Sequence, residues 1–318
     1  MDNAQLIDQL KTKYNELKKE IAGKIIGQND VIDKVLISIL SNGHSLLIGV
    51  PGLAKTLLVT AIAETLNLKY KRIQFTPDLM PSDIIGTEIL DNNKEFKFIE
   101  GPLFANIILA DEINRTPPKT QSALLEAMQE RRITAAGVTR TLEQPFFVLA
   151  TQNPIEQEGT YPLPEAQLDR FMFSVILDYP TFEEEVNIVE DTTGEGLRNL
   201  NKILDGKEII KYQEIIRLMP VPKHITEFAV RLTAKTRPGK PGADPLAEKY
   251  LNWGAGPRAS QFLISGAKTY AAIQGKYAPD IEDVKYVAEP ILRHRIFTNY
   301  KAEAEHITIE SLIQEFLK

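Results

Sequence analysis

Apolar residues recur at helical spacing in the first part of the chain. Five of them share one face of a helix that ends near Gly23, namely Leu6, Leu10, Tyr14, Leu17 and Ile21. A second amphipathic helix is predicted from about Asp30 to the Asn42-Gly43 pair, which is a typical helix stop. The chain therefore opens with two helices.

Beyond residue 43, apolar runs of strand length alternate with helical patterns. Strands are predicted at 44–50, 70–75, 106–112, 146–150 and 172–180, and helices at 55–68, 119–132 and 164–171. Alternation of this kind favours a parallel sheet with helices on both faces. The predicted fold class is α/β, with a parallel five-stranded sheet.

Two segments interrupt the alternation. Residues 76–90 carry prolines and acidic side chains and are predicted to be a loop, and 96–104 is a short β-like stretch. Residues 132–145 predict a hairpin that turns at Ala136-Gly137.

The pattern changes after Pro180, where strand-like runs stop and every periodic segment is helical. A second, mainly helical domain is predicted to begin between about 180 and 215. We divide the chain into an α/β core at 1–185 and a linker with a smaller all-α domain at 186–318.

Composition narrows the functional classes. The 318 residues contain 43% hydrophobic and 25% charged residues, which is typical of a soluble globular protein. The chain has no cysteine, which excludes disulfides, thiolate metal sites and cysteine nucleophiles. The first residues are charged and helical, and no apolar run approaches the roughly 18 residues of a membrane span. We expect a cytoplasmic protein without a membrane span.

The charge of the chain disfavours a nucleic-acid substrate. The formal net charge is −6, so nucleic-acid binding would need a local basic patch. The 75–104 segment instead sets two lysines, Lys94 and Lys97, against six acids: Asp78, Asp83, Glu88, Asp91, Glu95 and Glu100.

The stretch GVPGLAKT (49–56) nearly matches the phosphate-binding loop pattern G-x-x-x-x-G-K-[ST], and it lies between a predicted strand and a predicted helix. In such a loop, backbone N–H groups and the helix N-terminus hold phosphates, the lysine contacts the β and γ phosphates, and the Thr hydroxyl ligates Mg²⁺. The loop comprises Gly49, Val50, Pro51, Gly52, Leu53, Ala54, Lys55 and Thr56, followed by Leu57. The alternative for the stretch alone is an ordinary strand–turn–helix corner.

Ala54 stands where the pattern has its second glycine. The alanine keeps its backbone N–H, and at a negative φ its methyl group costs little. At a positive φ the loop would be strained, and nucleotide binding would be doubtful.

Asp111 and Glu112 end the predicted strand of IILADE. The carboxyl ends of parallel strands are where ligands sit in open α/β sheets. An aspartate there can hold Mg²⁺ and a neighbouring glutamate can deprotonate a water that faces the γ-phosphate. The alternative is a pair of acids at the start of the next helical segment. Two motifs in this order indicate nucleotide binding, with ATP and Mg²⁺ as the expected ligands.

With these motifs, most of the chain resembles the AAA+ ATPases, and the similarity is closest to the MoxR family. The stretches that resemble it are IIGQ (25–28), GVPGLAKT (49–56), FTPDLMPSDIIGT (75–87), GPLFANIILADEINR (101–115), ALLEAMQER (123–131), ATQNP (150–154), PLPEAQLDRF (162–171) and GPRAS (256–260). The resemblance implies a P-loop NTPase core with a helical lid. It also implies that an alanine before the lysine is accommodated, and that 75–104 and 132–145 are inserted hairpins.

The resemblance also assigns residues. Asn153 matches the first sensor, Arg170 an arginine finger that acts on the neighbouring subunit, and Arg258 a second sensor from the lid. Ile25, Ile26 and Gly27 are expected to line the adenine pocket, and Arg115 to face the subunit boundary. Without the resemblance, Asn153 is an Asn-Pro turn, Arg258 a helix cap, and Arg170 a partner of Asp169 or Glu165.

A finger acting on a neighbour implies a homo-oligomer, most simply a hexameric ring in the presence of nucleotide. The resemblance implies a chaperone-like motor that remodels or matures a protein client, such as a von Willebrand factor A domain protein or a metalloenzyme. The alternatives are a chelatase-type or nucleic-acid-directed motor of the same type, and a non-hydrolysing nucleotide switch or scaffold.

Overall fold

The computed structural model describes the chain except for residues 1, 91, 93, 156–158 and 195–198. Its centre is a five-stranded sheet in the order β2-β5-β8-β1-β9, in which all neighbours are parallel. The strands are β1 (Ser45–Ile48), β2 (Tyr70–Gln74), β5 (Ile107–Asp111), β8 (Phe147–Gln152) and β9 (Phe173–Ile176). The predicted α/β sheet is confirmed.

Helices cover both faces of the sheet because successive strand residues point to opposite sides. On β5, Ile107 and Leu109 join one apolar core and Ile108 and Ala110 join another. The first core includes α1 (Asn3–Ala22), α2 (Asn29–Leu40) and α3 (Lys55–Thr65), and the second includes α5 (Pro118–Glu130). All of β5 is buried, as expected for a central parallel strand.

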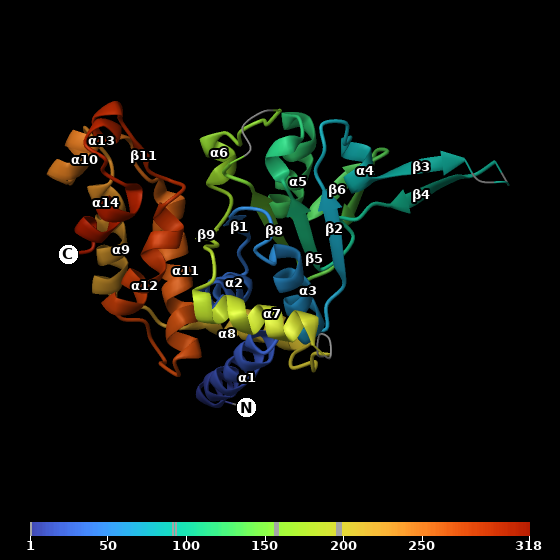
Figure 1. The fold of residues 1–318 in the computed structure, drawn as a ribbon, viewed down its shortest axis with the longest axis horizontal. Coiled ribbons are helices and arrows are strands. Elements are labelled where there is room, and N and C mark those ends of the chain that lie inside the picture. The colour runs from blue at the N-terminus through green and yellow to red at the C-terminus, as the bar shows by residue number, and fades with distance from the viewer. Residues whose placement is uncertain (1, 91, 93, 156–158, 195–198) are drawn as a thin grey trace.

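Two hairpins are attached to the core. β3 (Gly86–Leu90) and β4 (Phe96–Glu100) pair antiparallel and extend away from the body of the protein (Figure 1). The second hairpin, β6 (Arg132–Ala135) and β7 (Val138–Thr141), turns at Ala136-Gly137 as predicted. The prediction of a loop over 76–90 was wrong, because this segment contains α4 (Pro81–Ile85) and β3. Asp91, counted among the acids of this segment, lies outside the described residues.

The C-terminal part is helical and forms its own layer beside the sheet (Figure 1). After α6 (Glu165–Leu168) and β9, the chain continues through α7 (Phe182–Thr193) and α8 (Gly206–Leu218). The lid helices are α9 (Lys223–Lys235), α10 (Pro245–Tyr250), α11 (Pro257–Ile273), α12 (Ile281–Leu292), α13 (Tyr300–Ala304) and α14 (Ile309–Phe316). A short antiparallel pair, β10 (Leu251–Trp253) with β11 (Phe297–Thr298), adds strands to a lid that was predicted to be all helical.

Among the described residues, no helix is long and apolar enough to cross a membrane.

Candidate nucleotide site

The predicted residues of the phosphate-binding loop, Asp111, Glu112 and Asn153 converge because three parallel strands end at the same edge of the sheet. β1 leads into the loop that starts at Gly49, β5 ends at Asp111, and Asn153 follows β8. Lys55 is the first residue of α3, so the loop passes directly into a helix N-terminus. Backbone N–H groups and the positive end of the helix dipole therefore face this edge, which is the arrangement that binds phosphate.

Two glycines of the loop are required by geometry. A Cβ at Gly49 would lie 2.9 Å from the Cβ of Leu177, so only glycine fits between β1 and the end of β9. Gly52 has φ +89° and nothing within 4 Å of an added Cβ, so its backbone conformation, rather than space, favours glycine.

Ala54 has φ 53° and ψ 24°, which is the left-handed helical region. The favourable alternative, a negative φ with no steric cost, is therefore not what the structure shows. A left-handed alanine costs roughly 1–2 kcal/mol. Ala54 is exposed, and its carbonyl accepts the Leu58 N–H at 2.8 Å, which starts α3. The strain is local and leaves the helix start intact.

Lys55 reaches back across the loop. Its Nζ donates to the Gly49 carbonyl at 2.6 Å, so the ammonium group lies over the loop, where the phosphates of a nucleotide would bind. Thr56 follows in the first turn of α3. Val50 and Leu57 are partly buried against the core and Leu53 is buried, so the side chains of these three residues anchor the loop.

Asp111 is held by donors on both carboxylate oxygens. Thr151 Oγ1 donates to Oδ1 at 2.6 Å, and Arg72 donates to Oδ2 from Nε at 3.0 Å and from Nη2 at 2.6 Å. A carboxylate has about four lone-pair positions, and these contacts use three of them. Asp111 is buried, so its orientation is fixed.

Glu112 lies in a strained backbone conformation with φ 57°. Its N–H donates to Thr151 Oγ1 at 2.8 Å, and its carboxylate accepts from Gln74 Nε2 at 2.7 Å. Arg115 forms an ion pair with the same carboxylate oxygen at 3.2 Å. Left-handed strain in a non-glycine residue persists where surrounding contacts hold it, commonly at functional sites.

Sequence reasoning missed Arg72, Gln74 and Thr151. Arg72 and Gln74 are two residues apart on β2 and therefore share a face, and Gln74 is in register with Asp111. Their polarity within an otherwise strand-like segment was the available signal. The pairing of β2 with β5, rather than any local pattern, gives them their partners.

The residues present fit a magnesium ion that is bound largely by other ligands. No group of three or more His, Asp or Glu side chains suited to a metal occurs in the described parts of the chain. Mg²⁺ in nucleotide sites keeps several waters and takes one or two protein ligands besides the phosphates. The Thr56 hydroxyl and the remaining lone pair of Asp111 are sufficient for that role.

The segment predicted to contact the base divides into two parts. Ile25 is buried in the core with α1 and α2, whereas Ile26 and Gly27 are partly exposed. Gly27 has φ +77°, and a Cβ there would lie 2.9 Å from the carboxyl carbon of Glu184 on α7. Gln28 donates from Nε2 to the Asp178 carbonyl at 3.1 Å, which ties this segment to the end of β9.

Asn153 makes a local turn, because its Oδ1 accepts the Ile155 N–H at 3.2 Å. Its side chain is buried at the end of β8. Its predicted role as first sensor stays a prediction.

Arg170 and Arg258 lie away from this edge. Arg170 precedes β9, and β9 runs parallel to β1, so Arg170 is at the amino end of the strands. Arg258 pairs through Nη1 with Asp169 Oδ2 at 2.9 Å, which places it beside Arg170. Asp169 also accepts from Arg295 at 2.8 Å. The side chain of Arg170 has no ion pair with Asp169 or with any other described residue, so the local pairing considered for it is not found.

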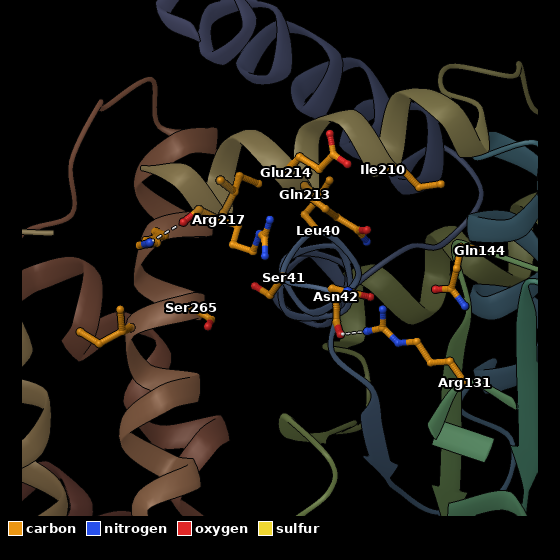
Figure 2. Close-up of a pocket in the computed structure, with 13 residues that line it drawn as sticks. Leu40, Ser41, Asn42, Arg131, Gln144, Ile210, Gln213, Glu214, Arg217 and Ser265 are labelled. Atoms are coloured by element: carbon orange, nitrogen blue, oxygen red, sulfur yellow. Dashed lines mark hydrogen bonds between the residues drawn. The ribbon is translucent and has the colours of Figure 1, made fainter. Parts of the chain in front are cut away.

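A cavity of about 400 Å³ lies at the amino end of the strands, between α2, α8 and α11 (Figure 2). Two of its cations, Arg131 and Lys268, contact carbonyl groups at helix ends. Arg131 Nη2 lies 3.5 Å from the Asn42 carbonyl just after α2, and Lys268 Nζ donates at 2.8 Å to the Arg217 carbonyl in the last turn of α8. Cations at helix C-termini offset the helix dipole. The cavity is at the amino end of the strands and the phosphate-binding loop is at the carboxyl end, so the cavity is separate from the nucleotide site.

The sheet order, the glycine loop and the carboxylates that end β5 define a P-loop nucleotide-binding protein of the AAA+ type. Residues 44–173 match the family described as ATPase family associated with various cellular activities (AAA), and residues 243–316 match the AAA lid domain.

Similar proteins identify the family within the AAA+ ATPases. The chain is 43% identical over 301 residues to the chaperone MoxR1 of Mycobacterium tuberculosis, covering 94% of this chain and 79% of the relative. It is 30% identical to the protein MoxR of Paracoccus denitrificans, covering 90% and 88%. A crystal structure from Cytophaga hutchinsonii, described as a candidate ATPase, is 42% identical with a TM-score of 0.91 over 98% of this chain and 96% of that one. The chain belongs to the MoxR family of AAA+ ATPases.

Proposed function

We propose that this protein is a Mg²⁺-dependent ATP hydrolase that acts as a ring-shaped homo-oligomer, most simply a hexamer, and remodels or matures a protein client. The observation that supports ATP hydrolysis is the position of Asp111 and Glu112 at the same edge of the sheet as the phosphate-binding loop with Lys55. We place the protein in the cytoplasm.

In this proposal the chain's own residues bind and orient. The loop amides and the Lys55 ammonium group hold the phosphates of ATP, and bound Mg²⁺ would offset charge on the β and γ oxygens. Glu112 accepts a proton from the attacking water, and Gln74 and Arg115 orient its carboxylate. Asn153 at the end of β8 positions the water or contacts the γ-phosphate.

A second subunit completes the site. Arg170 and Arg258 are at the amino end of the strands, whereas the loop is at the carboxyl end. A side chain at the amino end of the strands cannot reach the nucleotide bound at the carboxyl end of the same chain. We therefore propose that both arginines contact the nucleotide of the neighbouring subunit. Arginine in such a position offsets transition-state charge. The second sensor would then act across the subunit boundary, together with the finger.

The client is proposed from the family. Relatives carry the names chaperone MoxR1 and MoxR, and a von Willebrand factor A domain protein or a metalloenzyme is the client we propose. The projecting β3–β4 hairpin exposes Ile89, Leu90, Phe96 and Ile99, which suits a protein surface better than nucleic acid.

We also propose that the boundary between the core and the linker with the lid lies at residue 185.

A second candidate is a non-hydrolysing nucleotide switch, which the left-handed Ala54 favours. A Glu112→Gln variant separates the two. Under the proposal, it binds ATP in the presence of Mg²⁺ but loses at least about a hundredfold in turnover, as general-base catalysis contributes about that much. Wild-type protein that binds ATP without hydrolysing it, alone or assembled, would establish the switch.

Complementation tests the shared site. Arg170→Ala alone is expected to lose turnover and keep nucleotide affinity, and Lys55→Ala to lose both. Mixing the two restores part of the activity, because some boundaries then pair an intact loop with an intact arginine. A mixed oligomer of verified composition that stays inactive would exclude this arrangement.

A further inference from the structure

An uncovered apolar stripe runs along α7. Phe182, Val186 and Val189 are spaced at i, i+4 and i+7, so they share one face of the helix. Their exposed fractions are 83%, 41% and 53%. All twelve residues of Phe182–Thr193 are described, and none is buried.

Two more exposed apolar side chains precede α7 in the chain. Ile176 at the end of β9 and Tyr179 just before α7 are 45% and 70% exposed. Several large exposed apolar side chains within fourteen residues of the chain favour an interaction site. We call Ile176, Tyr179, Phe182, Val186 and Val189 the α7 stripe.

The α7 stripe is held next to the candidate nucleotide site. Thr181 caps α7 by accepting the Glu184 N–H, and the Glu184 carboxyl group lies against Gly27. Gln28 binds the Asp178 carbonyl two residues before the proline that precedes the cap. Figure 1 shows α7 below the sheet in this view, running from beside α11 toward α3. Glu184 is two residues from Phe182, so the two side chains lie on opposite sides of the helix. The α7 stripe therefore faces away from Gly27, on the outer side of a helix that borders the segment expected to contact the base.

The face that carries Arg170 and Arg258 has a matching hollow. A cavity of about 650 Å³ lies between α6 and the lid, beside Asp169, which binds Arg258. Its apolar lining comes from Ala166, Trp253 and Phe297, and Trp253 is 67% exposed. Its charged or titratable lining residues are Glu165, Asp169, His294 and Arg295.

Charge also matches between the two faces. The exposed acids of α7 are Glu183, Glu185, Glu190 and Asp191, which disfavours an anionic membrane surface as the occupant. On the opposite face, Arg170, Arg258 and Arg295 outnumber the acids Glu165 and Asp169, and Arg258 is about two-fifths exposed although it pairs with Asp169. Opposite charges around an apolar centre favour one relative orientation of two surfaces.

We propose that the α7 stripe of one subunit docks on a second copy of this chain. Phe182 then enters that neighbour's cavity between α6 and the lid, which Trp253 lines. This inference rests on the proposed function, because it needs the arginine face of one subunit to meet the nucleotide edge of the next. The contact is heterologous, so it repeats around a ring.

Cross-linking tests the contact directly, and the lack of native cysteine makes it specific. Phe182→Cys protein is mixed with Trp253→Cys protein in ATP and Mg²⁺, and treated with a short bis-maleimide. A covalent dimer is expected in this mixture and neither protein alone should yield it. The control replaces Trp253→Cys by Tyr277→Cys, because exposed Tyr277 lies past the far end of the 17-residue α11, about 25 Å from its start.

An equal yield from the Tyr277→Cys mixture, or a dimer from Phe182→Cys alone, overturns the proposed contact. The mass of the oligomer, measured as a function of protein concentration, provides a second test. Phe182→Ser is expected to raise the protein concentration needed for assembly at least about tenfold, whereas Tyr277→Ser leaves it unchanged. An unchanged assembly midpoint in Phe182→Ser also overturns the proposal.

These results are separable from the proposed function. If Arg170→Ala and Lys55→Ala complement each other while the Phe182–Trp253 cross-link is missing, the shared site stands and the docking is wrong. If the cross-link forms but Glu112→Gln hydrolyses ATP like the wild type, the docking stands and the catalytic assignment is wrong.

Discussion

The guanidinium group of Arg72 and the carboxylate of Asp111 form an ion pair between neighbouring strands. Two nitrogens of Arg72 donate to the same oxygen, at 2.6 and 3.0 Å. Arg72 Nη2 also donates to Gln74 Oε1 at 2.8 Å, and Gln74 in turn donates to Glu112. The two acidic residues of the site are therefore connected through β2.

Arg72→Met is expected to lower the Mg²⁺ concentration needed for nucleotide binding by about two- to fivefold. The variant removes a cation that competes for Asp111 Oδ2, and the effect is modest because Arg72 is about half exposed. A Mg²⁺ titration with a fluorescent ADP analogue measures it. Arg132→Met, which removes the exposed Glu130 pair, is the control. An unchanged or higher Mg²⁺ requirement in Arg72→Met contradicts the prediction.

Ala54→Gly is expected to stabilise the protein by about 1 kcal/mol, because glycine adopts φ 53° without steric cost. Nucleotide binding should be kept or strengthened. Ala123→Gly in α5, where the helix needs no such conformation, should instead lose about 0.5–1 kcal/mol. Urea denaturation of both variants provides the comparison. Destabilisation by Ala54→Gly would show that the alanine is not strained.

Stability is expected to fall between pH 6.5 and 4 because of His44. The buried ring accepts the Val148 N–H at Nδ1, so Nε2 carries the proton that is donated to the Met128 carbonyl. Burial, with a smaller contribution from nearby Arg131, lowers the pKa of His44 to about 4 against the opposing hydrogen bond to the Met128 carbonyl. The folded pKa is below the unfolded one, so the contribution is full above pH 6.5 and is lost on acidification.

Between pH 7 and pH 5, the lowered pKa of His44 is expected to reduce the free energy of unfolding by about 2 kcal/mol. Denaturation curves of the wild type and His44→Gln at both pH values measure it, and the variant should lose less stability over this range. Burial also lowers the pKa of His294, so some dependence on pH remains in the variant. Parallel pH profiles for the two proteins would refute the role of His44.

Asp169→Asn is expected to cost about 1–3 kcal/mol of folding free energy. Arg295 is buried, and burial lowers its pKa to about 10 while Asp169 opposes that shift. Removing the carboxylate charge leaves a buried guanidinium group with carbonyl partners only. Glu165→Gln, an exposed neighbour on α6, should change stability by less than about 0.5 kcal/mol. Equal denaturation midpoints for both variants would count against this role of Asp169.

The parts of the fold that were predictable depend on local patterns. β1, the loop and α3 follow from an apolar run, glycines and helical spacing in adjacent residues, and β5 with Asp111 follows in the same way. The segment 76–90 was predicted as a loop because prolines and acids dominate it. Its strand β3 exists through pairing with β4, and cross-strand pairing is not encoded in either strand alone.

Contacts within the site were less predictable, for a related reason. Arg72 and Thr151 bind Asp111 from strands that are 39 and 40 residues away in the sequence. The left-handed conformation of Ala54 depends on how the loop closes, and alanine itself disfavours it. The partner of Arg258 depends on where the lid packs, and only the folded chain brings Asp169 beside it.

The separation of the loop from Arg170 on opposite ends of the strands has a consequence for assembly size. If each boundary joins the loop edge of one chain to the arginine face of the next, an open chain of subunits always ends in a site without arginines. Only closure completes every site. Specific activity should then rise with protein concentration more steeply than nucleotide binding does, and an Arg170→Ala subunit added at an open end would leave the site it meets incomplete.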